Sequence, residues 1–283
     1  TTSKKIITIN LTDRTYDVNN FRDISKYIGG IGLGLKLMEI YADKNPVIFS
    51  VGPLNGFFPF ASKTSVVLNN DGVIEDIYLG GNLSSCIKYA GVDSIVIYGT
   101  APEKTTVNIL NTEVQFKDET TEIGTLGLPG KRSVLDTGST WYDKILLNGY
   151  FTSPENFLEI SFAEKNLKGL VITGKETYKV KSFEKYNQIY NKILARKNEL
   201  TVEQNMYPSC ANCPMGCGKS KTGEIGGNIM LHSLVACEYA DSIYSDIGIV
   251  FSCLNVLGYE YTHEDIENLP TLIEATLKRL ADQ

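Results

Sequence analysis

The chain has 283 residues, and its 27 lysines and arginines are outnumbered by 33 aspartates and glutamates, giving a net charge of −6. This acidic balance argues against nucleic acid as the main partner, because phosphate binding needs a basic surface. Apolar residues make up 42% and charged residues 21%, a composition typical of a folded chain rather than a disordered one. No stretch approaches the ~18 consecutive apolar residues of a membrane span, so we expect no membrane partner.

The first ten residues carry Lys4 and Lys5 ahead of a short alternating apolar run. This segment lacks the apolar core and the cleavage site of a signal peptide. We therefore expect a cytoplasmic protein.

Six short apolar runs in the first 175 residues predict β-strands. Each run is rich in β-branched residues and is bounded by glycine, proline, asparagine or aspartate. The runs lie at 5–11, 46–51, 64–68, 94–98, 105–110 and 167–173. Helical spacing is rarer here and predicts short helices at 33–41, after a glycine-rich entry, and at 82–90. The single tryptophan, Trp141, is assigned to packing.

The pattern changes after about residue 175. Residues 182–200 show apolar positions at helical spacing, with Ser182 as a suitable N-cap. Residues 231–258 read as largely helical, and Thr262 opens a last helix with acidic residues in its first turn. The predicted fold class is therefore α+β, with a β-rich N-terminal domain over 1–178 and a small helical region over 179–283.

The six cysteines are distributed unevenly. The first 200 residues hold Cys86 alone, whereas residues 210–253 hold the other five. A secreted disulfide framework would spread its cysteines through a short chain, so this clustering indicates a metal site. The chain has only two histidines, so a site that binds several metal ions must rely on thiolate ligands.

Three of these cysteines form a Cys-x2-Cys-x3-Cys loop at 210, 213 and 217. Gly216 and Gly218 permit positive φ and would let backbone N–H groups turn toward sulfur. These features favour a [4Fe–4S] cluster. Zinc and unligated thiols remain alternatives, although structural zinc more often uses two separated ligand pairs. The candidates for a fourth ligand are Cys237 and Cys253.

The loop Cys210-Ala-Asn-Cys213-Pro-Met-Gly-Cys217-Gly resembles the cluster motif of the aldehyde ferredoxin oxidoreductase family of tungsten enzymes. Further segments resemble that family in the family's own order, at 27–34, 46–56, 80–93 and 165–169. The resemblance implies the family's β-rich base domain, a [4Fe–4S] cluster and a tungstopterin or molybdopterin. It also allows a homodimer, which the family often forms.

The same resemblance implies site residues. The segment 257–265 is similar to a family segment downstream of the fourth cluster cysteine, and counting back by the family's interval gives Cys237. Cys253 and Cys86 are then read as buried thiols. Lys63 stands where the family has an arginine between pterin and cluster. Together with the matching glycine pair, it completes the cofactor-binding candidates: Lys63, Gly80 and Gly81.

The chain also departs from the family. Only 19 residues separate Cys217 from Cys237, where family enzymes carry most of two helical domains. Lys63 lacks the bidentate fork of arginine. The bulky segment 155–163 replaces a glycine-rich loop, and His232 replaces an aspartate that binds pterin in the family. We read His232 as a satisfied helix histidine.

Three functional hypotheses follow. The first is an iron–sulfur redox protein that carries electrons through one oxygen-sensitive [4Fe–4S] cluster, suited to anaerobic conditions, with an incomplete catalytic site of unassigned residues and a ferredoxin-like or larger redox protein as partner. The second is a minimal tungsten- or molybdenum-pterin oxidoreductase acting on aldehydes. The third is a non-catalytic subunit with a cofactor-handling or structural role.

Overall fold

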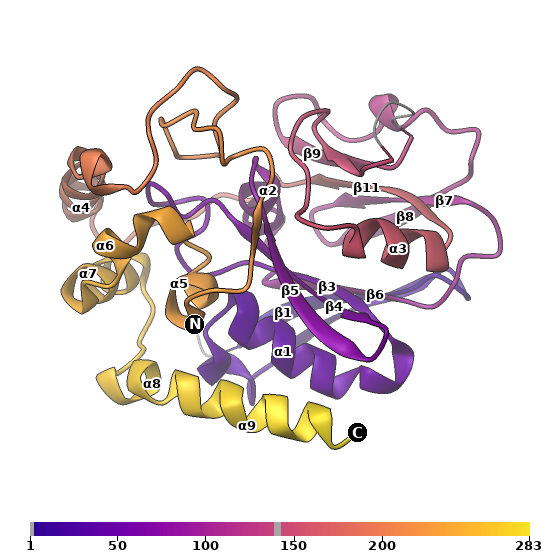
Figure 1. The fold of residues 1–283 in the computed structure, drawn as a ribbon, viewed down its shortest axis with the longest axis horizontal. Coiled ribbons are helices and arrows are strands. Elements are labelled where there is room, and N and C mark those ends of the chain that lie inside the picture. Colours follow the sequence, from indigo (N-terminus) through magenta and orange to yellow (C-terminus); the bar gives the residue numbers. More distant parts are fainter. Residues whose placement is uncertain (1–2, 139–142) are drawn as a thin grey trace.

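The computed structural model describes residues 3–138 and 143–283, which fold into two β-sheets with helices around them (Figure 1). Trp141 lies outside these described residues. The strands of the larger sheet are, in spatial order, β12 (Glu224–Ile225), β5 (Val73–Leu79), β4 (Thr64–Asn70), β3 (Val47–Ser50), β6 (Ser94–Tyr98), β1 (Lys4–Asn10) and β2 (Thr15–Phe21). Only β1 and β6 pair in parallel in this sheet.

The smaller sheet has five strands and follows the larger one along the chain. Its order is β10 (Leu146–Leu147), β9 (Arg132–Asp136), β11 (Leu167–Thr173), β7 (Thr105–Leu110) and β8 (Glu113–Lys117). The pairing of β7 with β11 is parallel, and the other pairings are antiparallel. All six predicted strands are confirmed, within about two residues at their ends.

Strands β2, β5, β8, β9, β10 and β12 were not predicted. The sequence of β2, Thr-Tyr-Asp-Val-Asn-Asn-Phe, has no apolar run, because nearly all of this edge strand is exposed. All seven residues of β2 pair with β1, which was predicted, so β2 is a strand because of its hydrogen bonds to that neighbour. Edge strands of this kind give little hydrophobic signal.

Two hydrophobic cores lie on opposite faces of the larger sheet. Adjacent residues of β1 divide between them, because successive side chains of a strand point to opposite faces: Ile6 belongs to one core and Ile7 to the other. The first core packs against the helices drawn below and to the left of the sheet in Figure 1. The second core joins the larger sheet to the smaller sheet and two helices.

The helices have the following bounds: α1 (Gly30–Ile40), α2 (Leu83–Tyr89), α3 (Phe157–Glu164), α4 (Phe183–Ala195), α5 (Ile229–Leu234), α6 (Asp241–Tyr244), α7 (Ile247–Leu257), α8 (His263–Glu267) and α9 (Leu269–Ala281). Two predicted caps are confirmed. Ser182 Oγ accepts from the Lys185 amide, and Thr262 forms a capping box with Asp265.

The segment predicted as largely helical at 231–258 contains a break between α5 and α6. Val235 adopts a left-handed conformation, with φ of 51°, and ends α5. Its carbonyl accepts a hydrogen bond from the Lys63 amide, and the Cys237 amide donates to Phe60 O at 2.9 Å. The backbone at 235–237 thus bonds to a distant segment instead of continuing a helix, and this places Cys237.

The C-terminal part is not separate from the sheet. β12 extends the larger sheet by pairing with β5, and the first core takes residues from both sides of residue 178. The finding is a mixed α/β structure, rich in sheet at the N-terminal end and helical afterwards. The domain boundary at 178 stays a prediction.

The predicted glycine-rich entry to α1 is a close-packed helix start. A Cβ at Gly30, whose φ is +48°, would lie 1.8 Å from the carbonyl oxygen of His232. A Cβ at Gly52 would lie 2.2 Å from the carbonyl oxygen of Leu234. Both glycines therefore allow α5 to dock by direct backbone contact.

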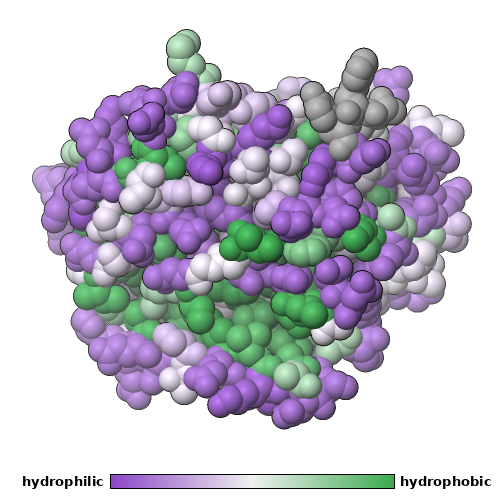
Figure 2. All heavy atoms as spheres, viewed as in Figure 1, coloured by the Kyte–Doolittle hydropathy of each residue, from purple (hydrophilic) through white to green (hydrophobic). Residues whose placement is uncertain are grey.

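No single helix in the described part of the chain is long and apolar enough to cross a membrane; the segments Glu238–Tyr244 and Ile247–Leu257 pass such a test only as a pair, bent by 89°. In the view of Figure 2, apolar side chains gather in the lower half of the face, around the place where Figure 1 shows α9 running below α1.

Candidate metal centre

The four cysteines proposed as ligands line one small cavity. Cys210, Cys213 and Cys217 come from the loop between α4 and β12, and Cys237 comes from the break after α5. Apolar side chains and Lys63 share this cavity. Cys210 and Cys217 are buried, and the other two are half-buried.

Backbone hydrogen bonds hold the cysteine loop and the Cys237 segment against the same part of the N-terminal region. The Ala211 amide donates to Gly81 O at 2.8 Å, and the Phe60 amide donates to Asn212 O at 3.2 Å. Phe60 O in turn holds the Cys237 amide. The cysteine loop and Cys237, which are distant in sequence, are therefore positioned by one shared support.

The two predicted cofactor glycines have different positions. A Cβ at Gly80 would lie 2.9 Å from Cys210 Sγ, so the absence of a side chain here lets the sulfur approach β5. A Cβ at Gly81 would instead meet Leu147 and Phe151. Gly80 thus borders the thiol cavity directly, whereas Gly81 supports it through its carbonyl.

The loop glycines also differ from each other. Gly216 has the expected positive φ, +49°, but Gly218 is outside the left-handed region, so that part of the prediction is wrong. The backbone N–H groups that face sulfur belong to Met215, toward Cys213, and to Tyr239, toward Cys237. Burial raises the pKa of Cys213 to about 11, although the Met215 amide opposes this shift.

Lys63 forms a buried ion pair with Glu224. Its Nζ lies 3.3 Å from Glu224 Oε1, and both side chains are at least 97% buried. Glu224 also accepts hydrogen bonds from the Cys237 thiol at 3.2 Å and from the Glu238 amide at 3.3 Å. Burial alone would lower the pKa of Lys63, but Glu224, Cys210 and Cys237 together raise it above its ordinary value. The lysine therefore carries a positive charge beside the thiol cavity.

Removing one partner of this pair should destabilise the protein strongly. Lys63→Met leaves Glu224 buried without a counter-charge, and we expect a loss of about 3 kcal/mol in the free energy of unfolding. The double variant Lys63→Met/Glu224→Gln should recover most of that loss, because no buried charge remains. Urea denaturation of the three proteins measures both effects, and equal stability of the single and double variants would contradict the pairing.

The spacing of the sulfurs fits a cluster better than a single ion. Among the described residues, no three cysteine sulfurs all lie within 4.8 Å of one another. A tetrahedral zinc ion with Zn–S bonds of ~2.3 Å would hold its sulfurs about 3.8 Å apart. A [4Fe–4S] cluster binds each thiolate at a separate iron and so spreads the sulfurs further. The donor set therefore fits such a cluster.

The other two cysteines lie away from this cavity. Cys253 is 0% exposed within α7. Cys86 lies in α2, where its thiol donates to Lys131 O at 3.6 Å and burial raises its pKa to about 12. Both match the expected buried thiol, which is the common state of a free cysteine in a core.

His232 corrects a prediction. It is 0% exposed in α5 and stacks on Tyr78 with ring centroids 3.6 Å apart, but neither ring nitrogen makes a hydrogen bond of ordinary geometry. Leaving a buried polar atom unpaired costs roughly 1–3 kcal/mol, so this is not the satisfied histidine that we predicted. Burial lowers its pKa, and the carboxylates of Glu224 and Asp76, together with the Gly226 backbone, partly oppose that shift.

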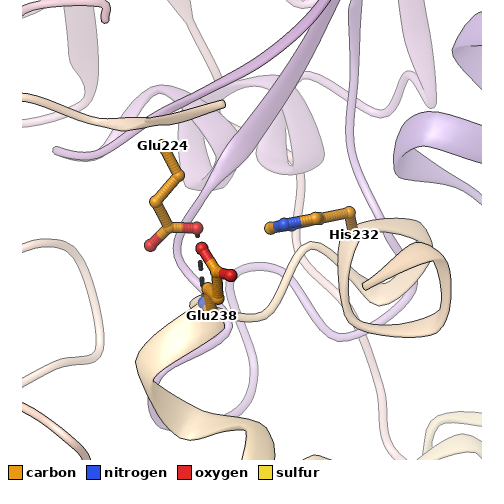
Figure 3. Close-up of side chains that lie close together, drawn as sticks. All are labelled: Glu224, His232 and Glu238. Atoms are coloured by element: carbon orange, nitrogen blue, oxygen red, sulfur yellow. Dashed lines mark hydrogen bonds between the residues drawn. The ribbon is translucent and has the colours of Figure 1, made fainter. Parts of the chain in front are cut away.

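Two carboxylates near His232 were missed. Ligand atoms of Glu224, His232 and Glu238 all lie within 4.8 Å of one another, and Figure 3 shows the imidazole pointing toward both carboxylates. Glu224 lies on the two-residue strand β12, which has no sequence signal of its own. Glu238 directly follows Cys237. Its position next to a proposed ligand was the sequence signal that could have marked it as a candidate site residue.

The described residues do not fit a pterin at the positions inferred from the resemblance. The charge of Lys63 is engaged by Glu224. The glycine-rich entry is filled by the backbone of α5. The segment 155–163 folds largely into α3, whose Leu158 and Phe162 pack in the second core.

Residues 6–135 match the model of the aldehyde ferredoxin oxidoreductase N-terminal domain. This region belongs to that domain family. The match covers β1 through most of β9, which is the region that supplies Lys63, Gly80 and Gly81.

Several relatives agree with this assignment. A tungsten-containing aldehyde ferredoxin oxidoreductase of Pyrococcus abyssi is 23% identical over 220 residues, covering 65% of this chain and 35% of the relative. The WOR-like subunit of an aliphatic sulfonate oxidoreductase from Pyrococcus furiosus is 28% identical over 147 residues, covering 46% of this chain and 23% of the relative. The chain thus spans about a third or less of these relatives.

The fold has a solved counterpart in the active-site complex BamBC of benzoyl coenzyme A reductase, described with 1,5-dienoyl-CoA. The TM-score is 0.60 at 14% identity, and the match covers 99% of this chain and 64% of that chain. At this identity the likeness shows a shared fold. It extends through the cysteine loop and the C-terminal helices as well as the N-terminal region.

Proposed function

We propose that this chain is an oxidoreductase-type protein that binds one [4Fe–4S] cluster through Cys210, Cys213, Cys217 and Cys237 and carries single electrons through it. The observation that carries this proposal is the convergence of these four thiols on one cavity, separate from the remaining two cysteines. Thiolate ligation of this kind is how proteins hold such clusters, and the cluster supplies one-electron redox chemistry.

Lys63 tunes the proposed centre. A fixed positive charge favours the reduced, more negative cluster, and the low dielectric of a buried site strengthens this effect. The adjacent Glu224 carboxylate offsets part of that charge. The lysine is therefore a positioning and electrostatic residue, whereas the cysteines are the ligands.

A redox partner is part of the proposal. One relative is named as a subunit of a larger oxidoreductase, and the structural counterpart is a complex of two named components. We therefore infer a ferredoxin-like or larger redox protein that exchanges electrons with this chain in the cytoplasm.

The second candidate is a minimal tungsten- or molybdenum-pterin oxidoreductase acting on aldehydes. It is favoured by the names of relatives, which are tungsten-containing enzymes. Two observations oppose it. The charge of Lys63 is paired with Glu224, and the backbone of α5 fills the space at the glycine-rich entry to α1. The third candidate, a non-catalytic cofactor-handling or structural subunit, requires no bound redox cofactor.

Metal analysis of anaerobically purified protein tests the choice. We expect roughly four iron and four sulfide per chain, the content of one [4Fe–4S] cluster, without stoichiometric tungsten or molybdenum. Stoichiometric tungsten or molybdenum would favour the second candidate. A chain that binds neither iron nor these metals after reconstitution with iron and sulfide would leave the third.

A further inference from the structure

The cluster of Glu224, His232 and Glu238 lies beside the thiol cavity but has a different donor set. One imidazole and two carboxylates place their ligand atoms within 4.8 Å of one another (Figure 3). These residues come from β12, α5 and the turn after Cys237, so only the tertiary fold brings them together. The proposed iron–sulfur function makes no use of the imidazole.

His232 supplies an independent sign that this cluster can bind a ligand. It is 0% exposed, its ring stacks on Tyr78, and neither ring nitrogen makes a hydrogen bond of ordinary geometry. The Gly226 backbone is a polar neighbour of the ring besides the acidic side chains and is too poorly placed for such a bond. Buried polar atoms are normally paired, so a buried imidazole that faces two carboxylates without a well-formed hydrogen bond is suited to binding a ligand. A metal ion would satisfy such a nitrogen, because neutral imidazole is a common metal ligand.

The backbone leaves room at this point. A Cβ at Gly227, whose φ is +118°, would lie 2.7 Å from His232 Nε2 and 3.5 Å from Glu238 Oε1. The glycine thus leaves open the space next to both ligand atoms. Glu238 is exposed, so the group can be reached from solvent.

The charges also suit a divalent cation. Glu224 Oε1 pairs with Lys63 and accepts from the Cys237 thiol. Oε2 accepts from the Glu238 amide, so a metal ion would use a remaining lone pair of this carboxylate. The Lys63–Glu224 pair is neutral overall, and Glu238 adds a negative charge. Buried charges are usually paired or coordinate metals. A mixture of imidazole and carboxylate ligands suits first-row divalent ions such as zinc.

We propose that Glu224, His232 and Glu238 form a binding site for a divalent transition-metal ion, distinct in its ligands from the cysteine centre. Zinc would bond nitrogen and oxygen at ~2.0–2.1 Å, with ligand atoms about 3.4 Å apart, which needs only a local contraction of the observed group. Water would complete the coordination on the exposed side of Glu238.

Zinc binding by the purified chain tests this proposal. After equilibrium dialysis against Zn²⁺, the wild-type chain should retain zinc whose X-ray absorption shows a shell of nitrogen and oxygen at ~2.0–2.1 Å. Glu238→Gln and His232→Ala should each weaken that binding by about tenfold or more. Glu238 is exposed, so its substitution avoids the risk that a core change at His232 prevents folding.

His263→Ala is the matched control, because it removes the other histidine from exposed α8 and should leave zinc binding unchanged. The double variant Cys210→Ser/Cys213→Ser should lose iron but keep the zinc, so failure of the cluster proposal is distinguishable from failure of this one. Zinc bound only through sulfur at ~2.3 Å, or unaffected by both Glu238→Gln and His232→Ala, would overturn the proposal.

Discussion

Cys237→Ser should remove the cluster, whereas Cys253→Ser should leave it in place. Cys237 lines the thiol cavity and is fixed there by the hydrogen bond that its backbone amide donates to Phe60 O. Serine offers a poorer ligand for iron, so we expect iron and sulfide to fall from roughly four per chain to below about one. Iron and sulfide analysis, together with the visible charge-transfer absorption of the thiolate-bound cluster, measures this loss.

Cys253→Ser is the matched control because it makes the same chemical change inside the core of α7. It should cost some stability by burying a hydroxyl without an assigned partner, while the iron content stays near that of the wild type. Equal loss of iron in both variants, or a larger loss with Cys253→Ser, would contradict the choice of Cys237 as fourth ligand.

Gly30→Ala should destabilise the whole protein by about 4 kcal/mol or more. The new Cβ would lie 1.8 Å from His232 O and 2.7 Å from Val235 Cγ2, and the residue would keep an unfavourable left-handed backbone. Neither α1 nor α5 can move easily, because both are packed in the first core. Chemical denaturation of wild type and variant measures the change.

Gly72→Ala separates crowding from backbone strain. Gly72 also has positive φ, +87°, but a Cβ there would have nothing within 4 Å. The substitution should therefore cost only the left-handed penalty of about 1 kcal/mol. If Gly30→Ala were no more damaging than Gly72→Ala, the close docking of α5 on α1 would be refuted. Because α5 leads into Cys237, Gly30→Ala should also reduce iron content.

Local signals predicted much of the fold. Strands β1, β6, β7 and β11 were found because they are short runs of buried, β-branched residues between turn formers. The cap at Thr262 was recognisable because capping is a contact between residues three apart. Strand β2 was not predicted, because it forms through pairing with β1 and its own side chains carry no strand pattern.

The cysteine spacing by itself determined that three thiols gather in one loop, since Cys210, Cys213 and Cys217 are close in the chain. The choice of Lys63 could also be made from sequence, through the resemblance. Its partner Glu224 could not, because 161 positions separate the two residues. Likewise, only the tertiary structure decided that His232 faces Glu224 and Glu238, and that the glycines before α1 serve the docking of α5. Such contacts depend on how β12, α5 and α1 are placed by the shared core, and no pattern within one segment encodes that placement.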